Sequence, residues 1–118
     1  MTPEKIIEIV ADYFHVDKDM LRVKNRNAEF VKPRHIAMYL CKYNTELSFR
    51  EIGKSFNKDH ASVIHAIKSV ENQIETNRKY REVFDEIELH VIQEEYKEKI
   101  YSEIVKSEVY QENDFYQT

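Results

Sequence analysis

Apolar residues recur at helical spacing through most of the chain. The first pattern begins after Thr2 and Pro3, which suit an N-cap and a first helical position, and it comprises Ile6, Val10, Tyr13 and Phe14. It predicts a helix over about residues 3–14. Asp17 suits the cap of a short second helix that carries Met20 and Leu21.

A basic segment without apolar periodicity follows, at residues 22–29, and is typical of a loop. Pro33 then suits the start of a third helix, which Asn44 and Thr45 end. Its apolar stripe comprises Ile36, Leu40 and Tyr43, with Ala37 and Cys41 beside them.

Two further helices are predicted to lie close together in the chain. Ser48 and Glu51 have the spacing of a capping box, which predicts a helix over about 49–56. Asp59 suits the cap of the next helix, about 60–76, whose apolar row is Val63, Ile67, Val70 and Ile74. A short helix, a tight turn and a longer helix predict a helix-turn-helix, although its usual turn glycine is missing.

The last helix is expected to begin after Asn77 and to continue beyond residue 105. Its first apolar stripe is Tyr80, Phe84, Ile87 and Val91. Beyond it, apolar residues continue in two rows, Ile92, Tyr96, Ile100 and Ile104 in one and Tyr101, Val105 and Val109 in the other. We therefore divide the chain into a helix-turn-helix domain, 1–91, and an acidic, partly helical extension, 92–118. The extension is predicted to fold back or to form a homodimer, the alternative being a solvated tail.

Composition supports an all-α fold, a compact helical bundle with the C-terminal helical extension. The 118 residues include one Gly and two Pro, too few for the tight turns of a β-sandwich. The single Cys cannot form an internal disulfide, and no run of eighteen apolar residues occurs, so a cytoplasmic protein without a membrane segment is expected.

The net charge of −4 hides an uneven distribution. Residues 22–68 hold ten basic and four acidic side chains, whereas the segments on either side are acidic. The middle of the chain is therefore a basic island suited to a polyanion.

The predicted helix 60–76 offers a polar face opposite its apolar row. Two residues correspond to about 200° on a helix, so the row Ala61, His65, Lys68 and Asn72 points away from the core. Imidazole and hydroxyl groups hydrogen-bond base edges or phosphates, an Ala methyl can touch a thymine methyl, and Lys pairs with phosphate. A polar face alone does not indicate DNA binding, because any solvent-facing helix is polar. The position of this helix after a tight turn favours the interpretation that it binds DNA.

Several motifs in this region closely resemble the C-terminal DNA-binding domain, domain IV, of the bacterial replication initiator DnaA. They are Pro33-Arg-His-Ile-Ala-Met-Tyr-Leu40, Glu51-Ile-Gly53 with Phe56, and Asp59-His-Ala-Ser-Val-Ile-His-Ala66, in a resemblance that spans about residues 6–91. The resemblance implies a helical bundle that binds double-stranded DNA at short sites called DnaA boxes. The second helix of the helix-turn-helix would enter the major groove, and a preceding basic loop the minor groove.

The resemblance also implies roles for particular residues. Arg26 would read the minor groove, Arg34 and His35 would lie near the DNA backbone, and Asp59, His60, Ala61, Ser62 and His65 would form the reading end of the helix. With the neighbouring cations, the predicted DNA-binding set is Lys24, Arg26, Arg34, His35, Lys58, Asp59, His60, Ala61, Ser62, His65 and Lys68. The expected role is in replication initiation or its control, including binding at a replication origin.

The sequence also departs from the family. The turn Asn57-Lys58 is one residue shorter than the usual Gly-Gly-Arg, Ala61 and Ser62 replace two threonines, and Glu29 adds a negative charge near the loop. A lower affinity and a different preferred site are expected. No Gly-rich nucleotide-binding loop occurs, so the ATPase domain is absent from this sequence and no enzyme activity is predicted.

Other chemistry is less favoured. His60 and His65 lie about 140° apart on a helix and no paired Cys occurs, so no metal or cofactor is predicted. Cys41 fits a buried position in an apolar stripe. The remaining alternative is a DnaA-like fold that acts as a protein-protein interaction or regulatory module with weak or no DNA binding.

Overall fold

The computed structural model describes residues 1–24 and 26–117, with side chains up to Ser107. In this part the chain forms α1 (Pro3–Phe14), the 3-10 helix η1 (Lys18–Leu21), α2 (Ala28–Asn44), α3 (Phe49–Ser55), α4 (His60–Thr76) and α5 (Arg78–Gln117). The described part contains no strand, which confirms the all-α prediction. None of its helices is both long enough and apolar enough to cross a bilayer.

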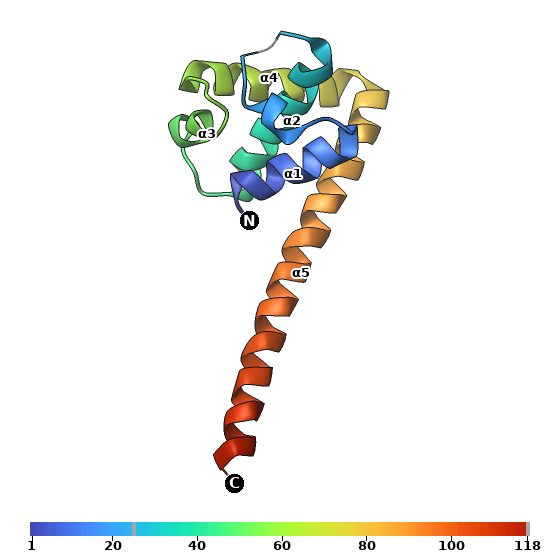
Figure 1. Ribbon diagram of the computed structural model, residues 1–118. Coiled ribbons are helices and arrows are strands. Elements are labelled where there is room, and N and C mark those ends of the chain that lie inside the picture. The colour runs from blue at the N-terminus through green and yellow to red at the C-terminus, as the bar shows by residue number, and fades with distance from the viewer. Residues whose placement is uncertain (25, 118) are drawn as a thin grey trace.

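Helix α2 lies at the centre of the bundle. It packs against α1 on one side and α4 on the other, while α3 lies beside the start of α4 (Figure 1). The predicted apolar stripes form one continuous core that includes Ile6, Leu21, Ile36, Phe56 and Val63, all fully buried. The first part of α5 closes this core with Phe84, Ile87 and Val91. Burial of these faces stabilises α1 and α3, which at 12 and 7 residues would be too short to be stable alone.

Capping side chains set most helix boundaries as predicted. Thr2 accepts a hydrogen bond from the Lys5 backbone amide, and Asp17 accepts one from the amide of Asp19. Ser48 and Glu51 form the complete capping box. These oxygens satisfy amides that have no partner within the helix.

Two predictions about α2 are wrong. The helix begins at Ala28, capped by Asn27, so Pro33 lies inside it and does not open it. Proline in the sixth helical position removes one backbone hydrogen bond, and burial of the α2 face outweighs that loss. Tyr43, predicted in the apolar stripe, is exposed, and its hydroxyl donates to Glu71.

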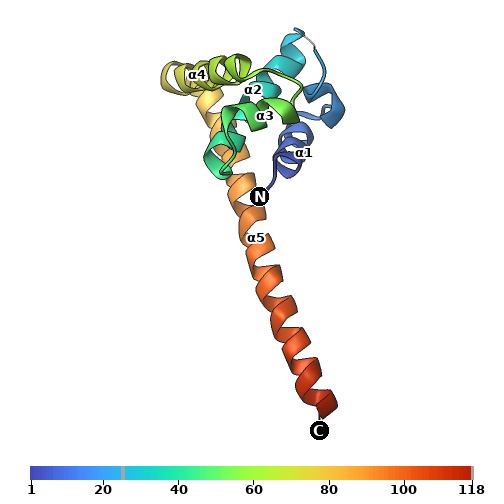
Figure 2. The same ribbon diagram turned by 90° about the vertical axis from the view of Figure 1, so that its left-hand side faces the viewer.

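Helix α5 continues far beyond the bundle. It is 40 residues long, and after its first part has packed on the core it leaves the other helices and runs to the C-terminal end in one direction (Figures 1 and 2). The backbone of the predicted extension is thus helical through Gln117. The side chain of Val109, which belongs to the second predicted row, lies outside the described residues, as does Thr118.

Candidate nucleic-acid interface

The turn between α3 and α4 is built on a close approach to Gly53. The Lys58 amide donates to the Gly53 carbonyl at 2.8 Å. A Cβ atom on Gly53 would lie 2.3 Å from the Lys58 carbonyl oxygen, so only glycine fits there without displacing the turn. Asn57 adopts a left-handed backbone with φ 56°, a conformation that Asn tolerates better than most residues. The glycine of this helix-turn-helix therefore lies in α3, and Asn57 takes the left-handed position.

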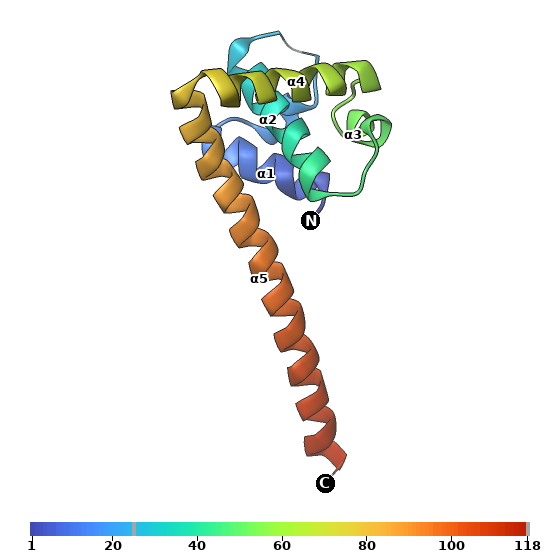
Figure 3. The same cartoon turned by 180° about the vertical axis from the view of Figure 1, so that it is seen from behind.

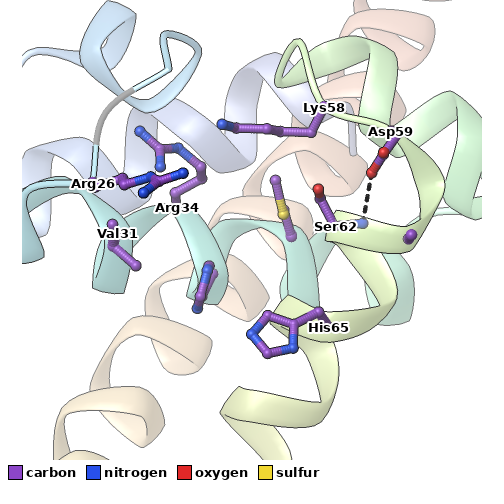
Figure 4. A pocket seen from close by; sticks show the side chains of 10 residues that line it. Arg26, Val31, Arg34, Lys58, Asp59, Ser62 and His65 are labelled. Atoms are coloured by element: carbon purple, nitrogen blue, oxygen red, sulfur yellow. Dashed lines mark hydrogen bonds between the residues drawn. The ribbon is translucent and has the colours of Figure 1, made fainter.

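Asp59 fixes the start of α4. Its carboxylate accepts a hydrogen bond from the Ser62 amide at 2.8 Å, as Figure 4 shows. This hydrogen bond is the main cause of the lowered pKa of Asp59, and the nearby His60 and Lys58 lower it further. The cap thus remains charged at neutral pH and holds the first turn of α4 in place.

The two faces of α4 divide as predicted. Val63, Ile67 and Val70 are buried in the core, and Ala66 is buried with them. The outward residues are exposed and comprise His60, Ala61, Ser62, His65 and Lys68. The polar row is therefore free to meet a ligand along the whole first half of the helix.

Buried Arg34 ties the basic loop, residues 22–27, to the bundle. The side chain is 3% exposed, and its guanidinium donates to the carbonyls of Leu21 at 2.9 Å, Val23 at 2.9 Å and Met20 at 3.3 Å. The turn between α3 and α4 is hydrogen-bonded to the same loop, because the Asn57 side-chain amide donates to the Arg22 carbonyl at 2.9 Å. The loop is thereby positioned relative to the helix-turn-helix.

A hollow of about 410 Å³ lies between the basic loop, α2 and the start of α4 (Figure 4). In the figure, the Lys58 side chain extends toward Arg34 across it. The hollow is lined by Arg26, Val31, Arg34, His35, Met38, Lys58, Asp59, Ala61, Ser62 and His65. We call it the basic groove. Of the eleven predicted residues, only Lys24, His60 and Lys68 lie outside this lining, and all three are exposed.

Positive charge is concentrated at the basic groove. Partial burial lowers the pKa of Lys58, and the charges of Arg34, Lys24 and Arg26 lower it further, while Asp59 opposes the shift. Burial also lowers the pKa of His35, with smaller effects from His65, Arg34 and Lys58. These groups disfavour one another's charged forms, so an anion placed among them would relieve the repulsion.

Sequence reasoning did not identify two kinds of residue at this site. Val31 and Met38 supply apolar lining to the groove, and their helical pattern gave no reason to separate them from the core. Asn57 was recognised as part of the turn, but not as its link to the basic loop. A contact between residues 35 positions apart leaves no local signal.

We expect Arg34→Ala to destabilise the fold and to release the basic loop. Hydrogen bonds from a charged group to buried carbonyls contribute about 1.5–3 kcal/mol, so the midpoint of urea unfolding should fall clearly. Arg50→Ala removes the same charge from an exposed position on α3 and should leave the midpoint nearly unchanged. Equal stability of the two variants would contradict an anchoring role for Arg34.

A capped short helix, a tight turn and a longer helix with an exposed polar face define this protein as a helix-turn-helix protein, a DNA-binding class. The family model for the bacterial DnaA protein helix-turn-helix matches residues 3–70. Because this match covers more than half of the chain, the chain belongs to that family. The matched region is the helix-turn-helix of that family.

Individual relatives agree with this assignment. The chain is 40% identical over 77 residues to chromosomal replication initiator protein DnaA 1 of Chlamydia pneumoniae, covering 65% of this chain and 17% of the relative. It is 39% identical over 89 residues to the DnaA protein of Bacteroides fragilis (strain YCH46), covering 75% of this chain and 19% of the relative. The chain thus spans less than a fifth of these curated relatives.

A solved structure has the same fold. A crystal structure described as a DNA replication initiation factor superposes with a TM-score of 0.69 at 36% identity. The similarity covers 78% of this chain and 28% of the other. The resemblance seen in the sequence motifs therefore extends to the arrangement of the helices.

Proposed function

We propose that this protein binds double-stranded DNA sequence-specifically in replication initiation or its control, at sites similar to DnaA boxes. In this proposal α4 enters the major groove, the basic loop enters the minor groove, and the protein acts in the cytoplasm without catalysis. The observation that carries the proposal is the basic groove, in which eight predicted DNA-binding residues from the loop, α2, the turn before α4 and α4 itself meet. Its charge suits a phosphate backbone running between the two reading elements.

The proposal gives the residues four roles. His60, Ala61 and Ser62 occupy the exposed start of α4, from which side chains reach base edges in this class of protein. Lys24 and Arg26 belong to the basic loop and suit the narrow minor groove, whose negative potential attracts cations. His65, further along the exposed face of α4, belongs to the reading end of that helix, and the phosphate contacts fall to His35, Lys58 and Lys68. Asp59 holds the helix start, and Arg34 holds the loop while adding positive charge.

Selection of bound duplexes from a random pool, followed by a salt titration on the enriched site, tests this function. Enrichment of one motif is expected, and each phosphate contact should add roughly 0.9 to the magnitude of the log-log salt slope. No enrichment and an affinity independent of salt would refute DNA reading and favour the interaction-module alternative. Enrichment of a motif unlike DnaA boxes would keep DNA reading and refute the site assignment.

We expect DNA binding to raise the pKa of His35. In the free protein, burial keeps this pKa below its ordinary value, with smaller effects from His65, Arg34 and Lys58. A phosphate near the ring favours the charged form, so binding takes up a proton, and affinity increases as pH falls between the bound and free pKa values. Titration of the His35 ring resonances by NMR with and without duplex measures the shift.

A control variant compares His35 with a histidine outside the basic groove. His35→Gln should weaken the pH dependence of affinity, whereas His15→Gln should not, since His15 lies at the end of α1, outside the groove lining. An unchanged or lowered pKa of His35 in the complex would place the phosphates elsewhere.

A further inference from the structure

The part of α5 that leaves the bundle carries an uncovered apolar row. Ile92, Tyr96 and Ile104 are 51%, 64% and 49% exposed, and Ile100 lies between them at the same four-residue spacing. Leu89, 54% exposed, continues the row toward the bundle. Figure 3 shows the outer part of α5 with no other helix beside it, whereas Glu94, nearer the bundle, still pairs with Lys5 of α1. Residues four apart share one side of a helix, so these side chains form one surface, which we call the apolar row.

The apolar row borders a hollow. Met1, Ile92, Glu95, Tyr96, Glu98 and Lys99 line this depression, where the N-terminal amine lies 4.0 Å from the Glu98 carboxylate. Half of the lining residues, Glu95, Glu98 and Lys99, are charged.

Charged residues follow one edge of the apolar row in a fixed order. Glu88, Glu95, Lys99 and Lys106 are spaced by seven, four and seven residues, which places all four within about 40° on the helix. None of them forms an ion pair within the part of the chain whose side chains are described. The half of this edge nearer the bundle is acidic, and the outer half is basic. The acidic half can therefore pair with the basic half of an identical helix that runs in the opposite direction.

We propose that α5 binds α5 of a second copy of this chain, the two helices running in opposite directions and centred near Glu98. In this register Ile92 meets Ile104 of the second copy, and Tyr96 meets its Ile100. Glu95 then lies opposite Lys99 of the second copy, and Glu88 lies opposite its Lys106. The apolar pairs are centred on residue 98 and the charged pairs on residue 97, so the two sets favour antiparallel registers that differ by two residues, about 3 Å along the helix.

A parallel pair does not fit the same residues. There the charged edge would face the opposite edge of the second helix, which carries His90, Lys97 and Tyr101. The described carboxylate on that edge, Glu94, lies seven residues before Tyr101 and already pairs with Lys5 of its own chain at 3.3 Å. Charge complementarity therefore selects the antiparallel arrangement.

This arrangement has a consequence for DNA. The basic loop and α4 lie at one end of the molecule and the C-terminal end lies at the other in all three views. An antiparallel pair places the two basic grooves at opposite ends of the dimer, where one dimer can hold two separate duplexes. The self-association does not rest on the proposed DNA binding, whereas the bridging of duplexes does.

Sedimentation of the full chain without DNA tests the dimer. We expect dimers in the micromolar range, and the Ile92→Gln, Ile104→Gln double variant should weaken association by about tenfold or more. Tyr43→Gln is the control: it removes an exposed apolar side chain from α2, away from the apolar row, and should leave association unchanged. A monomeric full chain, or a double variant that associates like the parent, would overturn the proposal.

Charge reversal tests the register. Glu95→Lys and Lys99→Glu should each weaken association by placing like charges opposite each other, and the two together should restore it. Failure of the combined variant to recover would overturn the proposed pairing.

Disulfide trapping tests the direction. A mixture of Ile92→Cys and Ile104→Cys chains should form mixed disulfides, while neither chain alone should cross-link efficiently. Cys41 does not interfere, because burial raises the pKa of its thiol to about 12. Cross-linking of the Ile92→Cys chain to itself would indicate a parallel pair and overturn the arrangement.

A capture assay tests the bridging separately. A duplex fixed to a surface should retain a second, labelled duplex through the parent protein, and the double variant should bind the fixed duplex but capture less of the second. Equal capture by both proteins would overturn bridging. Failure to bind any duplex would refute the proposed function, while sedimentation would still decide the dimer.

Discussion

Gly53→Ala is expected to lower the stability of the domain by about 1–3 kcal/mol, the range for forcing an extra methyl group into a packed site. The added Cβ would lie 2.3 Å from the carbonyl oxygen of Lys58 and 3.3 Å from that of Asp59. The backbone atoms of Lys58 and Asp59, at the end of the turn, cannot rotate away as a side chain can. The turn must therefore shift, and the first residues of α4 must shift with it, so specific DNA binding should fall along with stability.

The direction of the stability change on Gly53→Ala distinguishes a tightly packed position from an open one. Alanine has a higher helix propensity than glycine by about 1 kcal/mol, so a position with open space in α3 would be stabilised by the same substitution. Lys54→Ala, at an exposed neighbouring position, provides the control and should change the urea midpoint little. A Gly53→Ala variant more stable than the parent would show that the turn does not depend on the close contact between Gly53 and the Lys58 carbonyl oxygen.

The helix ends were predictable because their signals are local. Asp17, Ser48 and Asp59 each cap the helix that follows them, and a capping oxygen acts within three residues of its own position. Pro33 misled the prediction for α2, since proline suits a helix start but is also tolerated inside a helix that buries its face well. Asn27, the actual cap, lies in a polar segment where several residues could serve.

The candidate site was predictable in its residues but not in its assembly. Two-residue offsets on α4 separate the outward face from the core, and the motif resemblance supplied the loop and α2 residues. Long-range hydrogen bonds bring these residues together. The Arg34 guanidinium donates to the carbonyls of Leu21 and Val23, and the Asn57 side-chain amide donates to the carbonyl of Arg22. Such contacts depend on the packed bundle. The burial of Arg34 is the clearest example, because a basic residue in a basic segment ordinarily indicates an exposed side chain.

Substitutions on the two parts of α4 should have different effects on DNA binding. His60→Ala or Ser62→Ala is expected to reduce the discrimination between the selected site and random duplex by about 1–3 kcal/mol, the range for a good base contact. Both side chains are exposed at the start of the helix, so the fold should be retained. Titration of each variant against the selected and random duplexes at one salt concentration measures the difference.

Lys68→Ala provides the matched contrast on the same exposed face, two turns further along α4. A phosphate contact carries no sequence information, so its loss should weaken both duplexes alike and reduce the salt slope by roughly 0.9. The Asp59→Ala variant links the two effects, because removal of the carboxylate leaves the Ser62 amide without its acceptor and displaces the reading residues. It should therefore lower both the unfolding midpoint and the discrimination. Equal losses on selected and random DNA for His60→Ala and Ser62→Ala would show that the start of α4 does not read bases.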